Sequence, residues 1–194
     1  MAQLKIVNDW WDHYPRFFGR TAGSINFDNL LEELRPLCFR YDVKVYGKSY
    51  EARRLSATFK SPGDINHSYY DYFPSRPWED SEMVAKIKEK IEEQLGEKFD
   101  YCLAHVYRDG NDKIDWHADK EAANSVVASA SFGASRKFRF RKMGDASGWE
   151  EEIVLDHGDL LLMKLGCQKK YKHCVPCEKR VKGPRINLTF RQYE

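Results

Sequence analysis

The part of the chain that follows Phe99 alternates apolar and polar residues in short runs, and this pattern restricts the fold more than any other feature. Such a run predicts a strand with one buried face, because successive side chains of a strand point to opposite sides. Glycines separate the runs, as expected of turns. Many short strands at this spacing are typical of a jelly roll, a double-stranded β-helix of two facing sheets. The expected strands are Tyr101–Tyr107, 125–132, 137–141, 152–155, 160–165 and Arg185–Arg191.

Two helices are expected ahead of this region, each with one apolar stripe. The first begins after Asn26, and the second begins after Ser81, a favourable N-cap, and ends at Gly96. Residues 1–23 have no clear period, so we predict an irregular segment that packs on the core through its aromatic rings. The sequence thus predicts a mainly β fold with flanking helices. The stripes consist of Phe27, Leu30, Leu31 and Leu34 and of Val84, Ile87, Ile91 and Leu95.

Length and charge set limits on what the chain can do. Its 194 residues are enough for one domain with a single core. The 32 basic and 30 acidic residues nearly balance, so a nucleic-acid site has to be a local patch. Five cysteines form no disulfide framework, and there is no secretory segment or bilayer-spanning apolar run. We therefore expect an intracellular protein of the nucleus or cytoplasm, not secreted, with free thiols.

A histidine and an aspartate lie two positions apart at His117 and Asp119. On a strand they address the same point, and His173 is the best candidate for a third ligand. Two imidazoles and one carboxylate hold iron on one face and leave open positions for chemistry. Surface polar residues are the usual explanation of such a pair when it stands alone. A zinc site at Cys174 and Cys177 is a weaker alternative, because no second cysteine pair matches it.

The C-terminal strand has one polar and one apolar face. Arg185, Asn187, Thr189 and Arg191 share the polar face, and Ile186, Leu188 and Phe190 share the other. Two guanidinium groups on one face suit a small dicarboxylate, although a half-exposed strand with solvated arginines has the same pattern. On the strand Tyr101–Tyr107, His105 and Tyr107 can face the same cavity.

Taken in order, these segments resemble the AlkB family of iron(II)- and 2-oxoglutarate-dependent dioxygenases, with the eukaryotic DNA-repair members most similar. The similarity extends from about residue 45 to the C-terminus, and residues 1–40 have no convincing counterpart. The resemblance implies a single dioxygenase domain with an N-terminal extension (1–40), a nucleotide-recognition lid with a support helix (41–98) and a catalytic jelly-roll core (99–194). The motifs that carry it are Tyr107-Arg108-Asp109-Gly110, His117-x-Asp119, Ser129-x-Ser131-Phe132-Gly133, His157-Gly158-Asp159 and Asn187-Leu188-Thr189-Phe190-Arg191.

The resemblance also implies roles for matched residues. His117, Asp119 and His173 would bind Fe(II). Arg185 would contact the C1 carboxylate region of the cosubstrate 2-oxoglutarate and Arg191 its C5 carboxylate, with Tyr107 and Asn187 adding hydrogen bonds. The chain departs from the family at His105, where an asparagine is usual. An imidazole can still donate one hydrogen bond, but it is bulkier and titratable.

The implied activity is oxidative demethylation of N-alkylated bases in DNA, such as 1-methyladenine and 3-methylcytosine. Dioxygen and 2-oxoglutarate would be consumed, and succinate, carbon dioxide and formaldehyde released, as in the repair of DNA damage. A target base inside a duplex has to be flipped out or taken from a single strand. Alternatives are an RNA demethylase, an oxygenase of a non-nucleic-acid substrate, and a binding module that has lost turnover.

Aromatic and basic residues gather in the segment 41–78, where stacking and phosphate contacts are expected. Tyr46 matches a wedge position of duplex-repair members, but it could also be an ordinary strand tyrosine. Glu121 matches an acidic position near the base, with a solvated loop carboxylate as the alternative. The run 136–142 is basic, and its residues Lys137, Arg139 and Arg141 could follow a phosphate backbone or form a solvated face. We expect a monomer that acts on alkylated DNA or RNA, with nucleic-acid contacts at Tyr46, Arg53, Arg54, Tyr72, Glu121 and Arg139.

Overall fold

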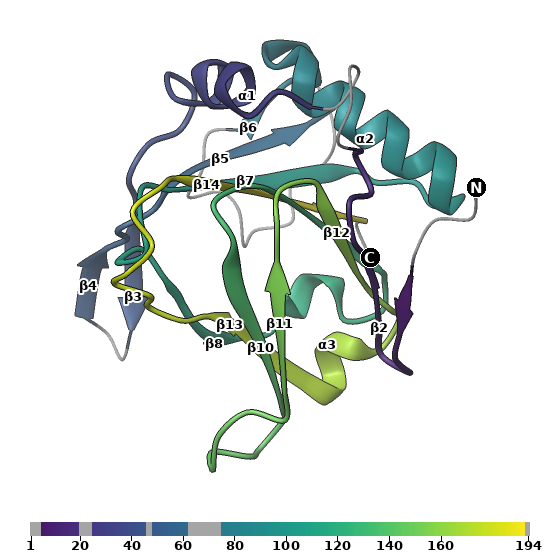
Figure 1. The fold of residues 1–194 in the computed structure, drawn as a ribbon, viewed down its shortest axis with the longest axis vertical. Coiled ribbons are helices and arrows are strands. Elements are labelled where there is room, and N and C mark those ends of the chain that lie inside the picture. Colours follow the sequence, from purple (N-terminus) through teal and green to yellow (C-terminus); the bar gives the residue numbers. More distant parts are fainter. Residues whose placement is uncertain (1–4, 20–24, 46–47, 62–74, 193–194) are drawn as a thin grey trace.

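The computed structural model describes residues 5–19, 25–45, 48–61 and 75–192. Two sheets face each other, and helices α1 and α2 cover the outer side of the larger sheet (Figure 1). This is the double-stranded β-helix with helices on one side that the alternating segments predicted. Among the described residues, no helix combines the length and the apolar character that a bilayer crossing requires.

The larger sheet has eight strands in the order β1-β2-β12-β9-β14-β7-β5-β6. Its central strand β14 pairs antiparallel with β7 on one side and with β9 on the other, along its whole length. The strands are β1 (Ile6–Val7), β2 (Trp11–Tyr14), β5 (Leu55–Lys60), β6 (Ser75–Arg76), β7 (Tyr101–Tyr107), β9 (Val127–Gly133), β12 (Asp159–Met163) and β14 (Arg185–Arg191).

The smaller sheet has four strands in the order β11-β10-β13-β8. These are β8 (Ile114–His117), β10 (Arg136–Lys142), β11 (Glu151–Leu155) and β13 (Tyr171–Val175). A separate hairpin is formed by β3 (Asp42–Val45) and β4 (Lys48–Glu51). Short helical turns complete the chain at η1 (Trp78–Asp80), η2 (Lys120–Ala122) and α3 (Cys167–Lys170).

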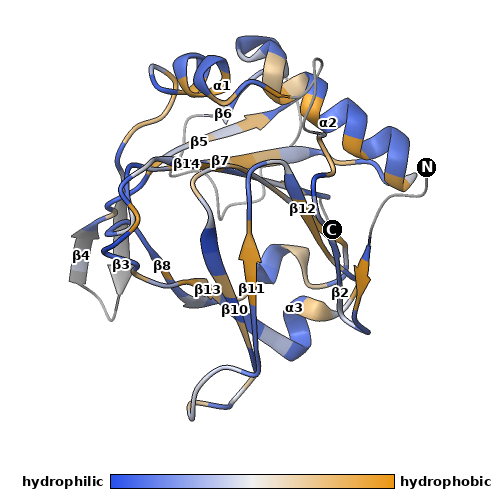
Figure 2. Ribbon diagram, viewed as in Figure 1, coloured by the Kyte–Doolittle hydropathy of each residue, from blue (hydrophilic) through white to orange (hydrophobic). Residues whose placement is uncertain are grey.

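Both expected helices form where the sequence predicted them, and Ser81 caps the second as expected. α1 (Phe27–Leu34) begins after Asn26, whose side chain accepts a hydrogen bond from the Asn29 backbone N–H. α2 (Glu82–Leu95) begins after Ser81 and ends at Gly96, which has φ = 72°, a conformation that glycine adopts without strain. The apolar stripes of both helices point at the larger sheet, and their polar faces point away (Figure 2).

The core has two layers, one on each side of the larger sheet. Ile186, Leu188 and Phe190 of β14 belong to the layer between this sheet and the helices. The second layer lies between the sheets and includes Phe140 and Trp11, whose rings stack with centroids 3.9 Å apart. The polar face of β14 therefore points into the space between the two sheets, which is where the site lies.

The expectation of an irregular N-terminal segment was wrong for residues 6–7, which form β1, and for residues 11–14. Residues 11–14 form β2, which pairs with β12 in the larger sheet. Trp11, Asp12 and His13 are all buried, so the strand has no alternation that the sequence could display. Burial of the polar side chains of Asp12 and His13 costs little free energy, because each of them has a hydrogen-bond or ion-pair partner. His13 Nε2 donates to Asp159 Oδ2 at 2.9 Å, and Asp12 pairs with Lys5 and Lys164 at 2.6 and 2.9 Å.

Candidate active site

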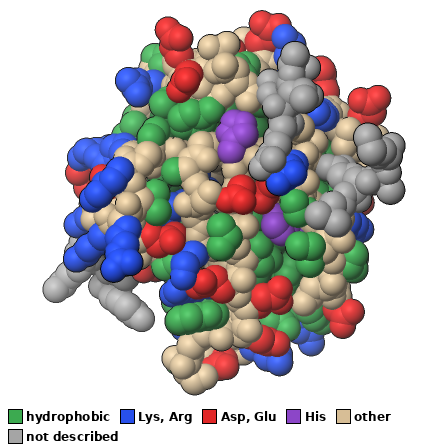
Figure 3. Space-filling view, viewed as in Figure 1, with side chains coloured by type: hydrophobic (Ala, Val, Ile, Leu, Met, Phe, Trp, Pro, Cys, Tyr) green, Lys and Arg blue, Asp and Glu red, His purple; other side chains and the backbone are tan. Residues whose placement is uncertain are grey.

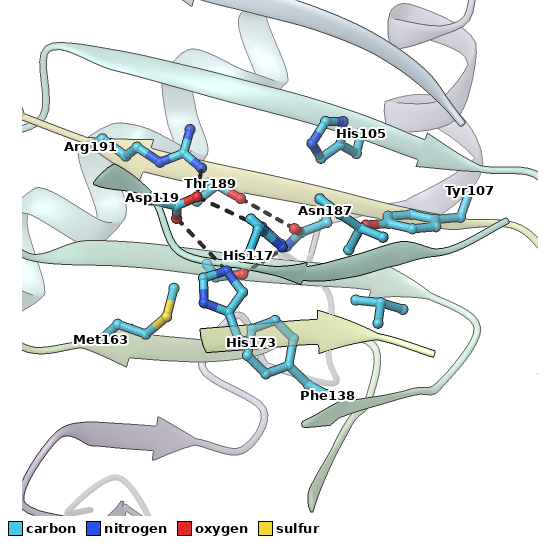
Figure 4. Close-up of a pocket in the computed structure, with 13 residues that line it drawn as sticks. His105, Tyr107, His117, Asp119, Phe138, Met163, His173, Asn187, Thr189 and Arg191 are labelled. Carbon is cyan, nitrogen blue, oxygen red and sulfur yellow. Dashed lines mark hydrogen bonds and ion pairs between the residues drawn. The ribbon is translucent and has the colours of Figure 1, made fainter. Parts of the chain in front are cut away.

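Three potential metal ligands meet between the two sheets. His117 ends β8, Asp119 follows two residues later, and His173 lies opposite His117 on the neighbouring strand β13. Their ligand atoms all lie within 4.8 Å of one another, and no other such group occurs among the described residues. Asp119 Oδ1 is 3.8 Å from His117 Nε2, and Asp119 Oδ2 is 3.9 Å from His173 Nε2 (Figure 4). The residues that the sequence pointed to are therefore brought together.

Surrounding groups hold each of the three side chains in place. The backbone carbonyl of Asp115 accepts a hydrogen bond from His117 Nδ1 at 2.8 Å, which leaves Nε2 of that ring facing the site. The backbone N–H of Asp119 donates to Gln168 Oε1 at 3.0 Å. The Phe138 ring stacks on His173 with centroids 5.2 Å apart. The sequence did not indicate Gln168, because its contact with Asp119 arises only from the fold.

The protonation states of the three side chains suit a cation. Burial lowers the pKa of His173 to about 3, helped by the nearby His117 ring, and burial also lowers the pKa of His117. Burial opposes ionisation of Asp119, but Arg191 and the two imidazoles outweigh it and lower its pKa to about 2. At neutral pH the site thus presents two neutral imidazoles and one carboxylate, which is the form that binds metal.

One oxygen of the Asp119 carboxylate is suited to binding a metal ion. Asp119 is 4% exposed, and its Oδ2 atom has no hydrogen-bond partner among the described residues. A buried unpaired carboxylate oxygen is unfavourable unless a ligand satisfies it. Two histidines and one carboxylate are the donor set of non-haem Fe(II) oxygenases. These residues therefore fit an Fe(II) ion.

A pocket with about 340 Å³ of open space adjoins the three ligands. Its large-sheet wall consists of His105 and Tyr107 from β7 and of Asn187, Thr189 and Arg191 from β14 (Figure 4). The Asn187 amide donates to Ser129 Oγ at 2.8 Å and to the Ala130 carbonyl at 3.0 Å, so its orientation is set from β9. The polar face of β14 lines this pocket as its alternation predicted.

Of the two arginines of β14, Arg191 lines the pocket and Arg185 lies at the other end of the strand. Arg191 Nη2 lies 2.8 Å from Asp119 Oδ1, beside the metal ligands. Arg185 lies near Tyr107, whose ring centroid is 5.1 Å from the guanidinium carbon, and its Nη2 donates to Ser131 Oγ at 3.0 Å. Arg191 is therefore the arginine that contacts one of the three potential metal ligands.

Arg185 is a buried cation without a carboxylate partner among the described residues. It is 1% exposed, and its Nε and Nη1 atoms have no hydrogen-bond partner there. Burial lowers its pKa to about 10, so it remains charged at neutral pH. A charged group in this position is stable only when an anion compensates it. The residue therefore fits the carboxylate of a bound ligand.

His105 is buried in the same wall and is held by a strand neighbour. Its Nδ1 atom lies 2.6 Å from Ser56 Oγ on β5. Burial and the positive charges of Arg54, Arg191 and Arg185 hold the pKa of His105 well below its usual range. The ring is therefore neutral, and with Ser56 bonded at Nδ1 it can carry its proton on Nε2.

The structure describes only some of the residues that were expected to contact nucleic acid, and these lie in different parts of the molecule. Tyr46 and Tyr72 lie outside the described residues. Arg53 is exposed, and Arg54 donates to the Lys113 carbonyl at 3.2 Å. Glu121 lies 3.7 Å from Arg191 Nε, close to the metal ligands.

The basic run on β10 divides between its two faces. Lys137, Arg139 and Arg141 share the outer face of the smaller sheet, as expected. Arg136 is 1% exposed and takes no part in this surface. It donates to Glu178 and to the carbonyls of Asp112 and Pro176, because it lies on the inward face with the phenylalanines of β10.

Comparisons with known proteins agree with this geometry. A family model described as the 2OG-Fe(II) oxygenase superfamily matches residues 12–191. The match begins well before residue 40, so the expectation that residues 1–40 have no counterpart was wrong from residue 12 onward. A solved structure titled "The structure of OsALKBH1" has the same fold, with a TM-score of 0.62 over 97% of this chain and 99% of that one, at 18% identity.

Two sets of curated relatives are more similar in sequence. Human alpha-ketoglutarate-dependent dioxygenase alkB homolog 3 is 36% identical over 155 residues, which are 74% of this chain and 52% of that protein. The chain thus spans about half the length of that relative. The mouse DNA oxidative demethylase ALKBH2 is 32% identical over 190 residues, which are 92% of this chain and 78% of that protein. The chain therefore belongs to the 2OG-Fe(II) oxygenase superfamily and, within it, to the AlkB family.

Proposed function

We propose that this protein is an iron(II)- and 2-oxoglutarate-dependent dioxygenase that removes N-methyl groups from nucleobases of DNA. The observation that carries the proposal is the pairing of two walls across one pocket. One wall holds the ligand group His117, Asp119 and His173, and the other is the polar face of β14, where Arg191 lines the pocket and Arg185 lies at the other end of the strand. When bound, Fe(II) and 2-oxoglutarate would activate dioxygen for oxidation of the methyl group, with release of succinate, carbon dioxide and formaldehyde.

The cosubstrate would lie along β14 between the two arginines. Arg191 touches the carboxylate of Asp119, so we assign it to the carboxylate of 2-oxoglutarate nearest the metal. Arg185, with its two unpaired nitrogens, would receive the distal carboxylate together with Tyr107. This reverses the assignment that the resemblance implied. His105 and Asn187 lie between these ends and would contribute hydrogen bonds.

Apolar side chains complete the pocket on the side of the smaller sheet. Ile114, Phe138 and Val175 line it there, and Met163 closes it near the metal ligands. Such a lining excludes water from the reacting methyl group and strengthens the interactions of the charged residues. The protein would thus orient the reactants and shield them, while the oxidation itself depends on the bound groups.

A nucleic-acid substrate is supported by the relatives and by the surface. One relative is named a DNA oxidative demethylase. Lys and Arg side chains gather on the left of the view in Figure 3, on the side where the hairpin β3–β4 lies in Figure 1. Arg53 and Arg54 follow this hairpin, and we retain them with Arg139 and Glu121 as candidate contacts, together with Tyr46 and Tyr72. RNA remains the alternative substrate.

We further propose a monomer of the nucleus or cytoplasm. Its domain would divide functionally into the N-terminal extension 1–40, the recognition lid and support helix 41–98, and the catalytic core 99–194. β2 from the N-terminal extension and β5 from the segment 41–98 belong to the same sheet as β14, which supports a single domain.

Succinate formation tests the proposed reaction. Purified protein with Fe(II) and 2-oxoglutarate would be given 1-methyladenine or 3-methylcytosine in single-stranded DNA, duplex DNA or RNA, with unmethylated strands as controls. We expect succinate and formaldehyde in equal amounts with methylated DNA, and loss of both in His117→Ala. Turnover that is unchanged in His117→Ala, or absent with every substrate, would exclude the proposal. Turnover with methylated RNA but not with methylated DNA would show that RNA is the substrate.

A further inference from the structure

The smaller sheet carries a second concave site, on its outer side near the β10–β11 connection. The groove has about 740 Å³ of open space and is lined by residues of β8, β10, β13 and the segment that joins β10 to β11. Figure 1 shows this connection projecting beyond the two sheets at the bottom of the view. Ile114 lines both the groove and the pocket at the metal ligands. The groove is therefore next to the active site, and of its lining residues only Arg139 has been assigned above, as a candidate nucleic-acid contact.

Two arginine–tryptophan pairs form the wall of this groove. The guanidinium carbon of Arg139 is 3.8 Å from the ring centroid of Trp149, and that of Arg141 is 4.4 Å from the centroid of Trp116. Trp149 is 52% exposed, which is unusual for so large an apolar side chain. A guanidinium covers one face of each ring. An exposed ring that a cation holds in place is a platform on which a planar aromatic ligand can stack.

The charge of the groove favours an anionic ligand. Lys113, Arg139 and Arg141 line it, against the single carboxylate of Asp115, which pairs with Lys113 at 2.8 Å. Arg139 is paired with Glu152 at 2.7 Å. Arg141 has no ion pair with a described residue, and its Nε atom is buried without a hydrogen-bond partner there. Its positive charge is thus available to a ligand.

We propose that this groove binds a single-stranded segment of nucleic acid that flanks the reacting base. Bases would stack on Trp149 and Trp116, and a phosphate would pair with Arg141. The inference rests on the proposed function in taking nucleic acid as the substrate. Trp116 directly precedes His117, and Cys174, which lines the groove, directly follows His173. The same two strands thus present the metal ligands on one side and the groove on the other.

Equilibrium binding of a fluorescein-labelled, unmodified oligothymidylate tests the groove. Anisotropy would be measured without iron or 2-oxoglutarate, at two salt concentrations. We expect Trp149→Ala to raise the Kd about tenfold, as for the loss of one base–aromatic stack. Arg141→Gln should raise it as well and reduce the salt dependence of binding, because one phosphate contact is lost. The matched control is Trp10→Ala, which removes a half-buried tryptophan that contacts Tyr171 and is not among the residues that line the groove.

The outcomes separate this inference from the proposed reaction. An equal Kd for the wild type, Trp149→Ala and Arg141→Gln would refute the proposal that this groove binds nucleic acid. A wild-type protein that does not bind the oligonucleotide would refute it as well. An equal loss of affinity in Trp10→Ala would refute the groove too. If Trp149→Ala does not fold, Trp149→Leu and Arg141→Gln provide the same comparison. A protein that forms no succinate but shows the expected Kd changes would contradict the demethylase and leave the groove in place.

Discussion

Ser56 Oγ and His105 Nδ1 are joined by a buried hydrogen bond of 2.6 Å, which holds the imidazole against the pocket at the metal ligands. Because the His105 ring is neutral, its Nε2–H can donate to a bound carboxylate. We predict that His105→Ala raises the KM for 2-oxoglutarate about tenfold, as for a lost hydrogen bond to a charged group. His105→Asn should stay close to the wild type, because an amide also donates. Succinate formation at varied 2-oxoglutarate measures both, and an unchanged KM in His105→Ala would contradict the role.

Arg185 should act on the cosubstrate and not on the metal. A lysine in its place keeps the charge but loses the planar fork that matches a carboxylate. We predict that Arg185→Lys raises the KM for 2-oxoglutarate at least about tenfold. The affinity for Mn(II), measured by calorimetry without cosubstrate, should stay at the wild-type value. A weaker affinity for Mn(II) would show that Arg185 also shapes the ligand group, contrary to its position near Tyr107.

Gln168 should matter to the metal because it accepts the backbone N–H of the ligand Asp119. Removing a partner that orients a ligand typically weakens metal binding about 10- to 100-fold. We predict a weakening in this range for Mn(II) binding to Gln168→Ala. Gln192→Ala is the matched control, since the partners of its amide in the described part of the chain are Glu97 and the Lys98 carbonyl. Equal affinities in the two variants would refute the prediction.

Asp159 should make stability depend on pH. Burial opposes its ionisation, but hydrogen bonds from His13 and from the backbone of Arg16 and Asp156 lower its pKa below the ordinary value of 3.8. A lowered pKa stabilises the folded state above the unfolded pKa, and this contribution is lost as the pH falls through the folded value. We predict that Asp159→Asn loses about 1–3 kcal/mol at neutral pH. In urea unfolding, the difference from the wild type should shrink below pH 3.8; a constant difference would contradict the ionic origin.

Gly133 and Gly144 allow crowding to be separated from backbone strain. Both have positive φ, 90° and 85°. A Cβ atom at Gly133 would lie 2.5 Å from the Phe27 ring and from the Pro184 carbonyl oxygen, whereas one at Gly144 would meet nothing within 4 Å. We predict that Gly144→Ala loses about 1–2 kcal/mol from strain alone. Gly133→Ala should lose clearly more, measured as the free energy of unfolding. Equal losses would mean that Phe27 moves aside freely.

Local patterns predicted the parts of the molecule that depend on local geometry. The alternation of β14 indicated both its apolar face and its pocket face, and the spacing of His117 and Asp119 indicated a shared target. His173, the third candidate ligand predicted from the sequence, joins the same group, although the strand that carries it was not among those expected. The sequence did not predict β13, because His173 and Cys174 are both buried although they lie on opposite faces of the strand, so the strand does not alternate clearly.

Contacts between distant segments could not be predicted in this way. Ser56 and His105 are 49 positions apart, as are Asp119 and Gln168, and only the strand order brings each pair together. The position of the two arginines relative to Asp119 also depends on contacts between distant segments. The alternation places both arginines on one face of β14, but only the position of Asp119 shows that Arg191 is the one beside the potential metal ligands.

The pairing of β14 on both edges links folding and activity. A slip of one residue against β7 or β9 would turn Arg185 and Arg191 into the apolar layer and would turn Ile186, Leu188 and Phe190 into the pocket. A misregistered molecule would therefore be both unstable and unable to bind the cosubstrate. For the same reason, every molecule that turns over substrate would have β14 in the correct register. The active fraction of a preparation would therefore equal the fraction of molecules in which β14 is correctly paired.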